Sequence, residues 1–286
     1  MYRSLEQLAD EGQLVYSMEK EVVREQIHAQ IIDAAYAARI GRQIFKPIQQ
    51  KAGHSLKFTL ETANSIAFNK VAETAEIPID REAYTQVEIT PEKYGALPSM
   101  STEIREDANW DLLRRNLVRC GTMAGLKEDS LVIAAMADST YGFNAVESHR
   151  VTTTGSELDI VDILGAIKYP EEDNYYPNLM VIHPTQKYEL NQIDTFVEAD
   201  KLGNRSAFEK GFCGRIFGLD VIVSPTCTEN YAYVLDTRHA GVIVIRRPLT
   251  TKVFETPSRD TISIAVTFRE AAKVLLAKAG ADIVVS

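Results

Sequence analysis

The sequence predicts an α+β protein, and three features of the chain indicate it. Apolar residues recur at three- and four-residue steps in segments 4–45 and 108–137, as on one face of a helix. Segment 54–101 instead alternates apolar and polar residues, which is typical of half-buried strands. After residue 156, short β-branched runs alternate with short helical segments. This irregular order of helices and strands favours the α+β class.

The first predicted helix covers roughly residues 4–45. We expect Gly41 and Pro47 to mark its end, because neither residue favours a continuing helix. An apolar stripe on a terminal arm needs a surface that covers it, either on its own domain or on a neighbouring subunit. We expect the stripe to contact a neighbouring subunit through Val15, Val22 and Ile27.

A long β-hairpin is predicted next, with strands at 65–68 and 84–90 and a polar, turn-like segment at 73–81. An isolated two-stranded hairpin is only marginally stable in water, so one of this length needs something to lie on. A neighbouring subunit is the expected support. The residues that we expect to make this contact are Phe68, Val71, Glu73, Glu76, Ile77, Asp80 and Arg81.

The rest of the chain mixes both kinds of element. The second long helix has Asp107 or Asn109 available as its N-cap. It is followed by a loop, a shorter helix at 157–166 and an acidic turn at 171–174. Further elements are predicted at the following places: a strand at 179–182, a helix at 185–193, and strands around 221–223, 231–235, 242–245 and 262–268.

Composition limits the class of protein. Of the 286 residues, 45% are hydrophobic and 25% are charged, which is typical of a globular chain. No apolar run is long enough to predict a transmembrane helix, and residues 1–10 lack the apolar core of a signal peptide. We therefore expect the protein to be made and kept in the host cytoplasm. Its three widely spaced cysteines argue against a disulfide framework.

The charge of the chain bears on nucleic acid as a partner. A formal net charge of -9 opposes tight general binding to nucleic acid, which requires clustered cations. The pairs Arg114–Arg115 and Arg246–Arg247 invite a DNA interpretation, but such pairs among many acidic residues are usually solvated surface. Enclosing DNA without sequence-specific binding needs little attraction and stays compatible with this charge.

Enzymatic interpretations find little support. The chain contains no phosphate-binding loop, no H-E-x-x-H motif and no G-x-S-x-G motif. One possible metal cluster consists of Cys213, Cys227, His183 and His239. These residues lack the short paired spacing of zinc ligands. The pair Cys213 and His183 has no identifiable third group to orient it as a nucleophile and base. The sequence therefore predicts no catalytic, cofactor-binding or metal site, although a soluble α/β enzyme with an unrecognised site remains an alternative.

Four blocks of sequence occur in a suggestive order along the chain. The first is Phe68-Asn-Lys-Val-Ala-Glu-Thr-Ala-Glu-Ile-Pro78, and the second, Tyr84 through Ser101, leads into Ser101-Thr-Glu-Ile-Arg-Glu-Asp107. The third is Asn178-Leu-Met-Val-Ile-His-Pro184, and the fourth is Gly214-Arg-Ile-Phe-Gly-Leu-Asp-Val-Ile-Val-Ser224. Together they resemble the major capsid protein family with the Hong Kong-phage capsid fold, shared by tailed phages, some archaeal viruses and encapsulins.

This resemblance implies a Hong Kong-phage-type capsid fold with a defined order of parts. The parts expected from it are an N-terminal helical arm (1–53), an extended β-hairpin loop (54–92), a peripheral domain with a long spine helix (93–155), an axial domain (156–240), peripheral-domain strands (241–270) and a C-terminal segment that returns to the axial domain (271–286).

The resemblance also implies a function. It implies a structural major capsid protein that assembles through pentamers and hexamers into an icosahedral shell around double-stranded DNA. Scaffold, portal and cement proteins are the expected partners, the virion is the expected location, and no membrane is involved. The alternative within the fold is an encapsulin-type compartment with an enzyme cargo. Some family members join Lys to Asn across subunits; Lys57 and Lys70 lie near the loop, but their partners are not identifiable from the sequence.

Overall fold

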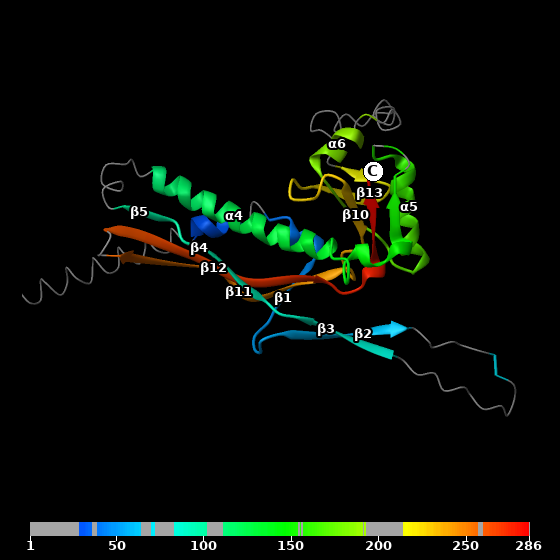
Figure 1. Ribbon diagram of the computed structural model, residues 1–286, viewed down its shortest axis with the longest axis horizontal. Helices are drawn as coiled ribbons and strands as arrows, with labels where there is room; N and C mark the ends of the chain where they lie inside the picture. Colours follow the sequence, from blue (N-terminus) through cyan, green and yellow to red (C-terminus); the bar gives the residue numbers. More distant parts are fainter. Residues whose placement is uncertain are drawn as a thin grey trace, which may run out of the picture. The chain divides into compact units, whose positions relative to one another are not determined.

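The computed structural model describes residues 29–35, 39–63, 70–71, 83–101, 111–153, 155, 157–190, 192, 214–256 and 260–285. The chain divides into two units, each built from segments that are distant in sequence (Figure 1). The first unit contains Met1–Arg42, Glu92–Ile133 and Arg247–Glu270, and the second contains Gln43–Pro91, Ala134–Arg246 and Ala271–Ser286.

The first unit packs a long helix on a sheet. Helix α4 (Asp111–Met136) is 26 residues long and confirms the predicted second helix over the described residues (Figure 1). Strands β4 (Glu92–Ala96) and β5 (Ser99–Ser101) both pair antiparallel with β12 (Thr261–Val274). One apolar core joins these elements: Ile31, Ala35, Ala124, Leu249, Ile264, Val266 and Phe268 are all buried in it. This helix-on-sheet arrangement buries one face of each element.

The N-terminal helical segment 29–35 packs directly on α4. Ile31 and Ala35 are fully buried, which confirms the apolar stripe in this described part. A Cβ atom added to Gly121 of α4 would lie 2.4 Å from the carbonyl oxygen of Ile31 and 2.9 Å from Cβ of Ala34. The two helices therefore meet backbone to backbone at Gly121, where only a glycine fits.

The predicted end of the first helix is wrong. Arg39 and Ile40 are not helical, Gly41 begins the four-residue helix α2 (Gly41–Ile44), and Pro47 lies in strand β1 (Lys46–Gln49). The helix does not continue to Phe45 because tertiary contacts hold residues 40–49 in other conformations. β1 pairs in parallel with Val242–Ile245 of β11 (Gly241–Thr256), and the amides of Ile40 and Gly41 donate to a side chain of α4.

The second unit contains a six-stranded sheet with the order β6-β13-β10-β7-β9-β8. All four residues of its β7 are buried, as expected for a strand covered on both faces. The strand bounds are β6 Arg150–Thr152, β13 Gly280–Val284, β10 Tyr231–Leu235, β7 Leu179–Ile182, β9 Leu219–Val223 and β8 Arg215–Ile216. The strands predicted at 179–182, 221–223 and 231–235 are confirmed.

Helices α5 (Ile160–Glu172) and α6 (Pro184–Leu190) belong to the same unit. The sequence predicts this helix over 157–166. The observed α5 begins three residues later and ends six residues later than predicted. A capping box between Asp159 and Asp162 defines the observed start. The acidic residues Glu171 and Glu172, predicted as a turn, form the end of the helix, which contains Pro170. Among the described residues, short 3-10 helices are η1 (Phe143–Ala145), η2 (Glu147–His149) and η4 (Ala277–Ala279).

The predicted hairpin is present in the second unit as β2 (Leu56–Ala63) and β3 (Ala83–Ile89). The two strands are antiparallel, with Leu56 opposite Ile89 and Ala63 opposite Ala83 (Figure 1). The strand predicted at 84–90 is confirmed, and the one predicted at 65–68 lies outside the described residues. The base of the hairpin packs on β1 and β11 through buried Val87, Ile89, Val242 and Val244.

Candidate assembly surfaces and a buried charge cluster

Among the described residues, the base of the hairpin is the part that packs on the core of its own unit. Val87 and Ile89 of β3 are 6% and 3% exposed, whereas Tyr84 on the same strand is 59% exposed. Leu56, Phe58 and other apolar residues of β2 pack against the same core. Residues 84–86 of β3, farther from the base of the hairpin, are therefore exposed in the single chain.

Polar contacts fix the base of the hairpin further. Nζ of Lys273 lies 3.9 Å from the centroid of the Tyr141 ring and donates a hydrogen bond to the carbonyl oxygen of Glu88 at 3.3 Å. The Ser55 hydroxyl donates to the Glu88 carboxylate, and this bond, with nearby Lys57, lowers the pKa of Glu88. The base of the hairpin is therefore attached to two further segments of its unit.

Most residues expected at subunit contacts lie outside the described part of the chain. Val71 is described, and its side chain is 39% exposed. The others outside the described residues are Val15, Val22, Ile27, Phe68, Glu73, Glu76, Ile77, Asp80 and Arg81. Their roles as contact residues stay predictions.

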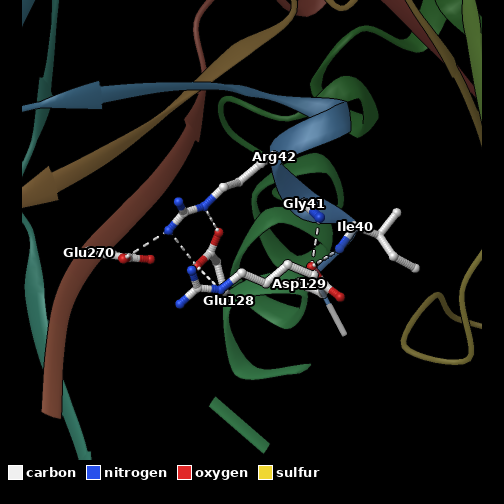
Figure 2. Close-up of polar contacts among 7 residues, drawn as sticks. Ile40, Gly41, Arg42, Glu128, Asp129 and Glu270 are labelled. Atoms are coloured by element: carbon white, nitrogen blue, oxygen red, sulfur yellow. Dashed lines mark hydrogen bonds and ion pairs between the residues drawn. The ribbon is translucent and has the colours of Figure 1, made fainter. Parts of the chain in front are cut away.

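A buried charge cluster lies within the first unit and consists of Arg39, Arg42, Glu128, Asp129 and Glu270 (Figure 2). Arg42 donates to Glu128 through Nε at 2.7 Å and through Nη2 at 3.2 Å, so it contacts both carboxylate oxygens. Nε of Arg39 forms an ion pair with Oε2 of Glu128 at 2.9 Å. The side chain of Glu128 is only 1% exposed, so these charges interact away from water.

Asp129, the next residue of α4, binds the backbone that precedes α2. One of its carboxylate oxygens accepts hydrogen bonds from the amides of Ile40 at 2.9 Å and Gly41 at 2.6 Å (Figure 2). A Cβ on Gly41 would lie 2.9 Å from a methyl carbon of Val132, so the backbone approaches α4 closely here. Burial raises the pKa of Asp129 above its ordinary value.

Glu270 brings β12 into the cluster. Its side chain is fully buried, and Nη2 of Arg42 lies 3.7 Å from its Oε1. Burial, together with the neighbouring Glu128 carboxylate, raises the pKa of Glu270 to about 8. Three separate segments of the first unit thus meet in one charged cluster.

The enzymatic alternatives gain no support from the described residues. The Cys227 thiol is buried and donates to the carbonyl oxygen of Tyr231 at 3.3 Å, and burial raises its pKa to about 12, so it is not an activated nucleophile. Cys213 lies outside the described residues. His183 and His239 each bond a near neighbour, Thr185 and Asp236, at 2.9 and 2.8 Å.

Within the described ranges, no group of three or more His, Cys, Asp or Glu side chains could hold a metal ion. No helix in the described part of the chain is long and apolar enough to cross a membrane.

The second arginine pair, Arg246–Arg247, forms hydrogen bonds within the fold. Arg246 donates to the carbonyl oxygen of Gln50 at 3.0 Å, and Arg247 donates to the hydroxyl of Thr267 at 3.2 Å. Arg115 is exposed on α4. These contacts give Arg246 and Arg247 a structural role within the subunit.

Solved capsid structures share this fold. The capsid protein of cyanophage P-SCSP1u matches with a TM-score of 0.70 and 14% identity, covering 87% of this chain and 88% of that one. The mature capsid of bacteriophage PhiM1 matches with a TM-score of 0.66 and 10% identity, covering 86% of each chain. The virus-like particle of Pyrococcus furiosus matches with a TM-score of 0.61 and 14% identity, covering 91% of this chain and 99% of that one. These matches show that the chain has the same fold as these capsid and particle proteins.

Sequence comparison identifies the family. The model of the phage capsid protein family matches residues 84–283, and the chain belongs to this family. No curated protein matches the chain in sequence. The resemblance to the capsid protein family and the Hong Kong-phage-type α+β fold are therefore confirmed, and the protein is a structural capsid protein.

Proposed function

We propose that this protein is the major capsid subunit that assembles through pentamers and hexamers into a closed icosahedral shell around double-stranded DNA. The family match over residues 84–283 is the observation on which the proposal rests. The net charge of -9 suits a wall that encloses DNA without binding it tightly. The subunit has no catalytic role in this proposal. It assembles in the host cytoplasm with scaffold, portal and cement proteins and ends in the virion.

The hairpin supplies the main contact between subunits in this proposal. Its base is held by the core of its own unit, and Tyr84 is exposed where the strand leaves that core. An unsupported hairpin is marginal in water, so a second copy of the chain covers the far part of it. The contact residues on the hairpin are Phe68, Val71, Glu73, Glu76, Ile77, Asp80 and Arg81, and those on the N-terminal arm are Val15, Val22 and Ile27.

Shortening the hairpin tests this role. Residues 64–82 are replaced by Asn-Gly, which joins the paired residues Ala63 and Ala83 through a two-residue turn. The variant is expected to stay folded, because the packed base of the hairpin is retained, but to form no closed shells. Thermal unfolding reports folding, and electron microscopy reports assembly. Closed shells from this variant would contradict the proposed role.

A milder variant serves as the matched comparison. Val71→Ser removes an apolar side chain that is 39% exposed, so the stability of the subunit should change by no more than about 0.5 kcal/mol. Fewer closed shells at equal protein concentration are expected if Val71 lies in a contact. Unchanged assembly would exclude Val71 from the contact while leaving the larger deletion as the test of the hairpin.

Electron microscopy of the full-length protein, expressed alone and examined at moderate and low salt, tests the whole proposal. Closed shells, tubes or rings of five and six copies are expected, since shells use repeated contacts between identical subunits. A monomer or dimer under every condition would count against the proposal. If co-expression with candidate scaffold genes also failed to give shells, the proposal would be wrong.

A further inference from the structure

The buried charge cluster is electrically balanced only if one of its carboxyl groups is neutral. Arg39 and Arg42 supply two cations, and Glu128 and Asp129 supply two carboxylates that both accept bonds or ion pairs from the N-terminal segment. An ionised Glu270 would add an unbalanced negative charge to a fully buried position. Burying an unbalanced charge is costly, so the folded chain favours the neutral acid at Glu270.

The contacts of Glu270 agree with this balance. Neither of its oxygens accepts a hydrogen bond from an N–H or O–H group of the described residues, and Arg42 lies at the longer distance of 3.7 Å. The carboxylate of Glu128 is another neighbour, and two carboxyl groups can form a hydrogen bond only when a proton lies between them. A neutral Glu270 donates that bond, and an ionised Glu270 repels Glu128.

We propose that the proton that Glu270 holds against the Glu128 carboxylate controls how firmly residues 39–42 are attached to α4 and β12. Loss of the proton places two anions side by side and draws Arg42 from Glu128 toward Glu270. The contact between residues 39–42 and α4 then loosens. This device is a property of the single subunit and is independent of whether the chain forms shells.

Each element that packs around Glu270 carries charged groups. Arg39 and Arg42 come from the N-terminal segment, and Glu128 and Asp129 come from α4. On β4, Glu92 pairs in register with Glu270 but is exposed and accepts a hydrogen bond from the Tyr94 hydroxyl. On β11, Arg247 is exposed and donates to Thr267 on β12. The arginines oppose the rise in the pKa of Glu270, and burial and Glu128 outweigh them.

The direction of the pH effect follows from linkage. The pKa of Glu270 is about 8 in the folded chain against an ordinary 4.5, so between these values only the folded state keeps the proton. The contribution of Glu270 to stability is fully present below about pH 4.5 and is lost as the pH rises toward about 8. Above that value both states have lost the proton, and the dependence ends.

Glu270→Gln tests the proposal, because an amide keeps the shape of the neutral acid and cannot ionise. The full-length wild type and variant are compared in the same assembly state, checked by gel filtration, by denaturant unfolding from about pH 5 to about pH 9. The folding constant of the wild type should fall relative to that of the variant by up to about tenfold per pH unit between about pH 5 and pH 8, then level off. A ratio that stays constant across this range would overturn the proposal.

Trypsin provides a second measurement that reports on the N-terminal segment itself. Trypsin cleaves after arginine, so cleavage after Arg39 or Arg42, identified by fragment mass, requires this segment to leave α4. At about pH 9, where linkage leaves Glu270 ionised, the wild type should be cut there about tenfold faster than Glu270→Gln. At about pH 6 the two rates should agree within about twofold. Equal rates at both pH values would overturn the proposal, whatever the outcome of shell assembly.

Discussion

Replacing Glu128 by alanine is expected to lower the free energy of unfolding by about 3–5 kcal/mol, the largest effect of any single polar substitution that we predict. The change removes the carboxylate that lies 2.9 Å from Arg39 and 2.7 Å from Arg42, so both guanidinium groups lose this ion pair. Glu270 can ionise in response, but Arg42 lies 3.7 Å from it. We therefore expect the lower part of this range. Denaturant unfolding at neutral pH measures the effect.

Glu172→Ala is the matched control for this prediction. Glu172 also forms an ion pair, with Lys168 at 3.4 Å, but both side chains are more than half exposed. Exposed pairs contribute about 0–1 kcal/mol, so this variant should unfold almost as the wild type does. If both variants lost the same stability, burial of the Glu128 cluster would not be the source of its effect.

Gly121→Ala is expected to destabilise the protein by about 1–3 kcal/mol, because it overpacks a site where two helices meet. The new Cβ would lie 2.4 Å from a backbone oxygen of Ile31, and backbone cannot move aside as a flexible side chain can. Segment 29–35 must therefore shift away from α4 and expose Ile31 and Ala35. Thermal unfolding measures the loss, and hydrogen exchange of residues 29–35 should become faster.

Gly165→Ala on α5 is the control, and its expected effect has the opposite sign. Its Cβ would meet only the methyl groups of Val151, at 3.6 and 3.9 Å, which are ordinary contacts. Alanine in a helix is favoured over glycine by about 0.5–1 kcal/mol, so this variant should be more stable than the wild type. A loss of equal size at Gly121 and Gly165 would show that the close crossing of the helices at Gly121 is not the source of the effect.

Much of the fold follows from periodicity within single segments. The apolar repeat of α4, the run of β-branched and aliphatic residues in β7 and the alternation in β3 each lie within a few neighbouring residues. Such patterns depend on the 3.6- and two-residue repeats of helix and strand, which are the same in any tertiary context. The order of four sequence blocks then indicated the capsid family. These features could be predicted before any coordinates were known.

Element boundaries were less predictable. The strands predicted at 242–245 and 262–268 are β11 and β12, which extend to Gly241–Thr256 and Thr261–Val274. Their outer residues are polar, and they are strands because β4 and β5 provide pairing partners for β12. The first predicted helix ends early for a related reason, since β1 finds a partner in β11. Pairing between distant segments supplies hydrogen bonds that local propensity does not contain.

The sequence by itself determined the class of fold, the main helices and strands and the family of the protein. Tertiary structure alone decided which charges are buried together. Arg42 and Glu128 are 86 residues apart, and nothing near either one indicates the other. The two adjacent acidic residues of α4 gave only a weak signal, because a charged pair on a helix is usually solvated. A periodic pattern is a property of one element, whereas the energy of a buried charge depends on which elements meet around it.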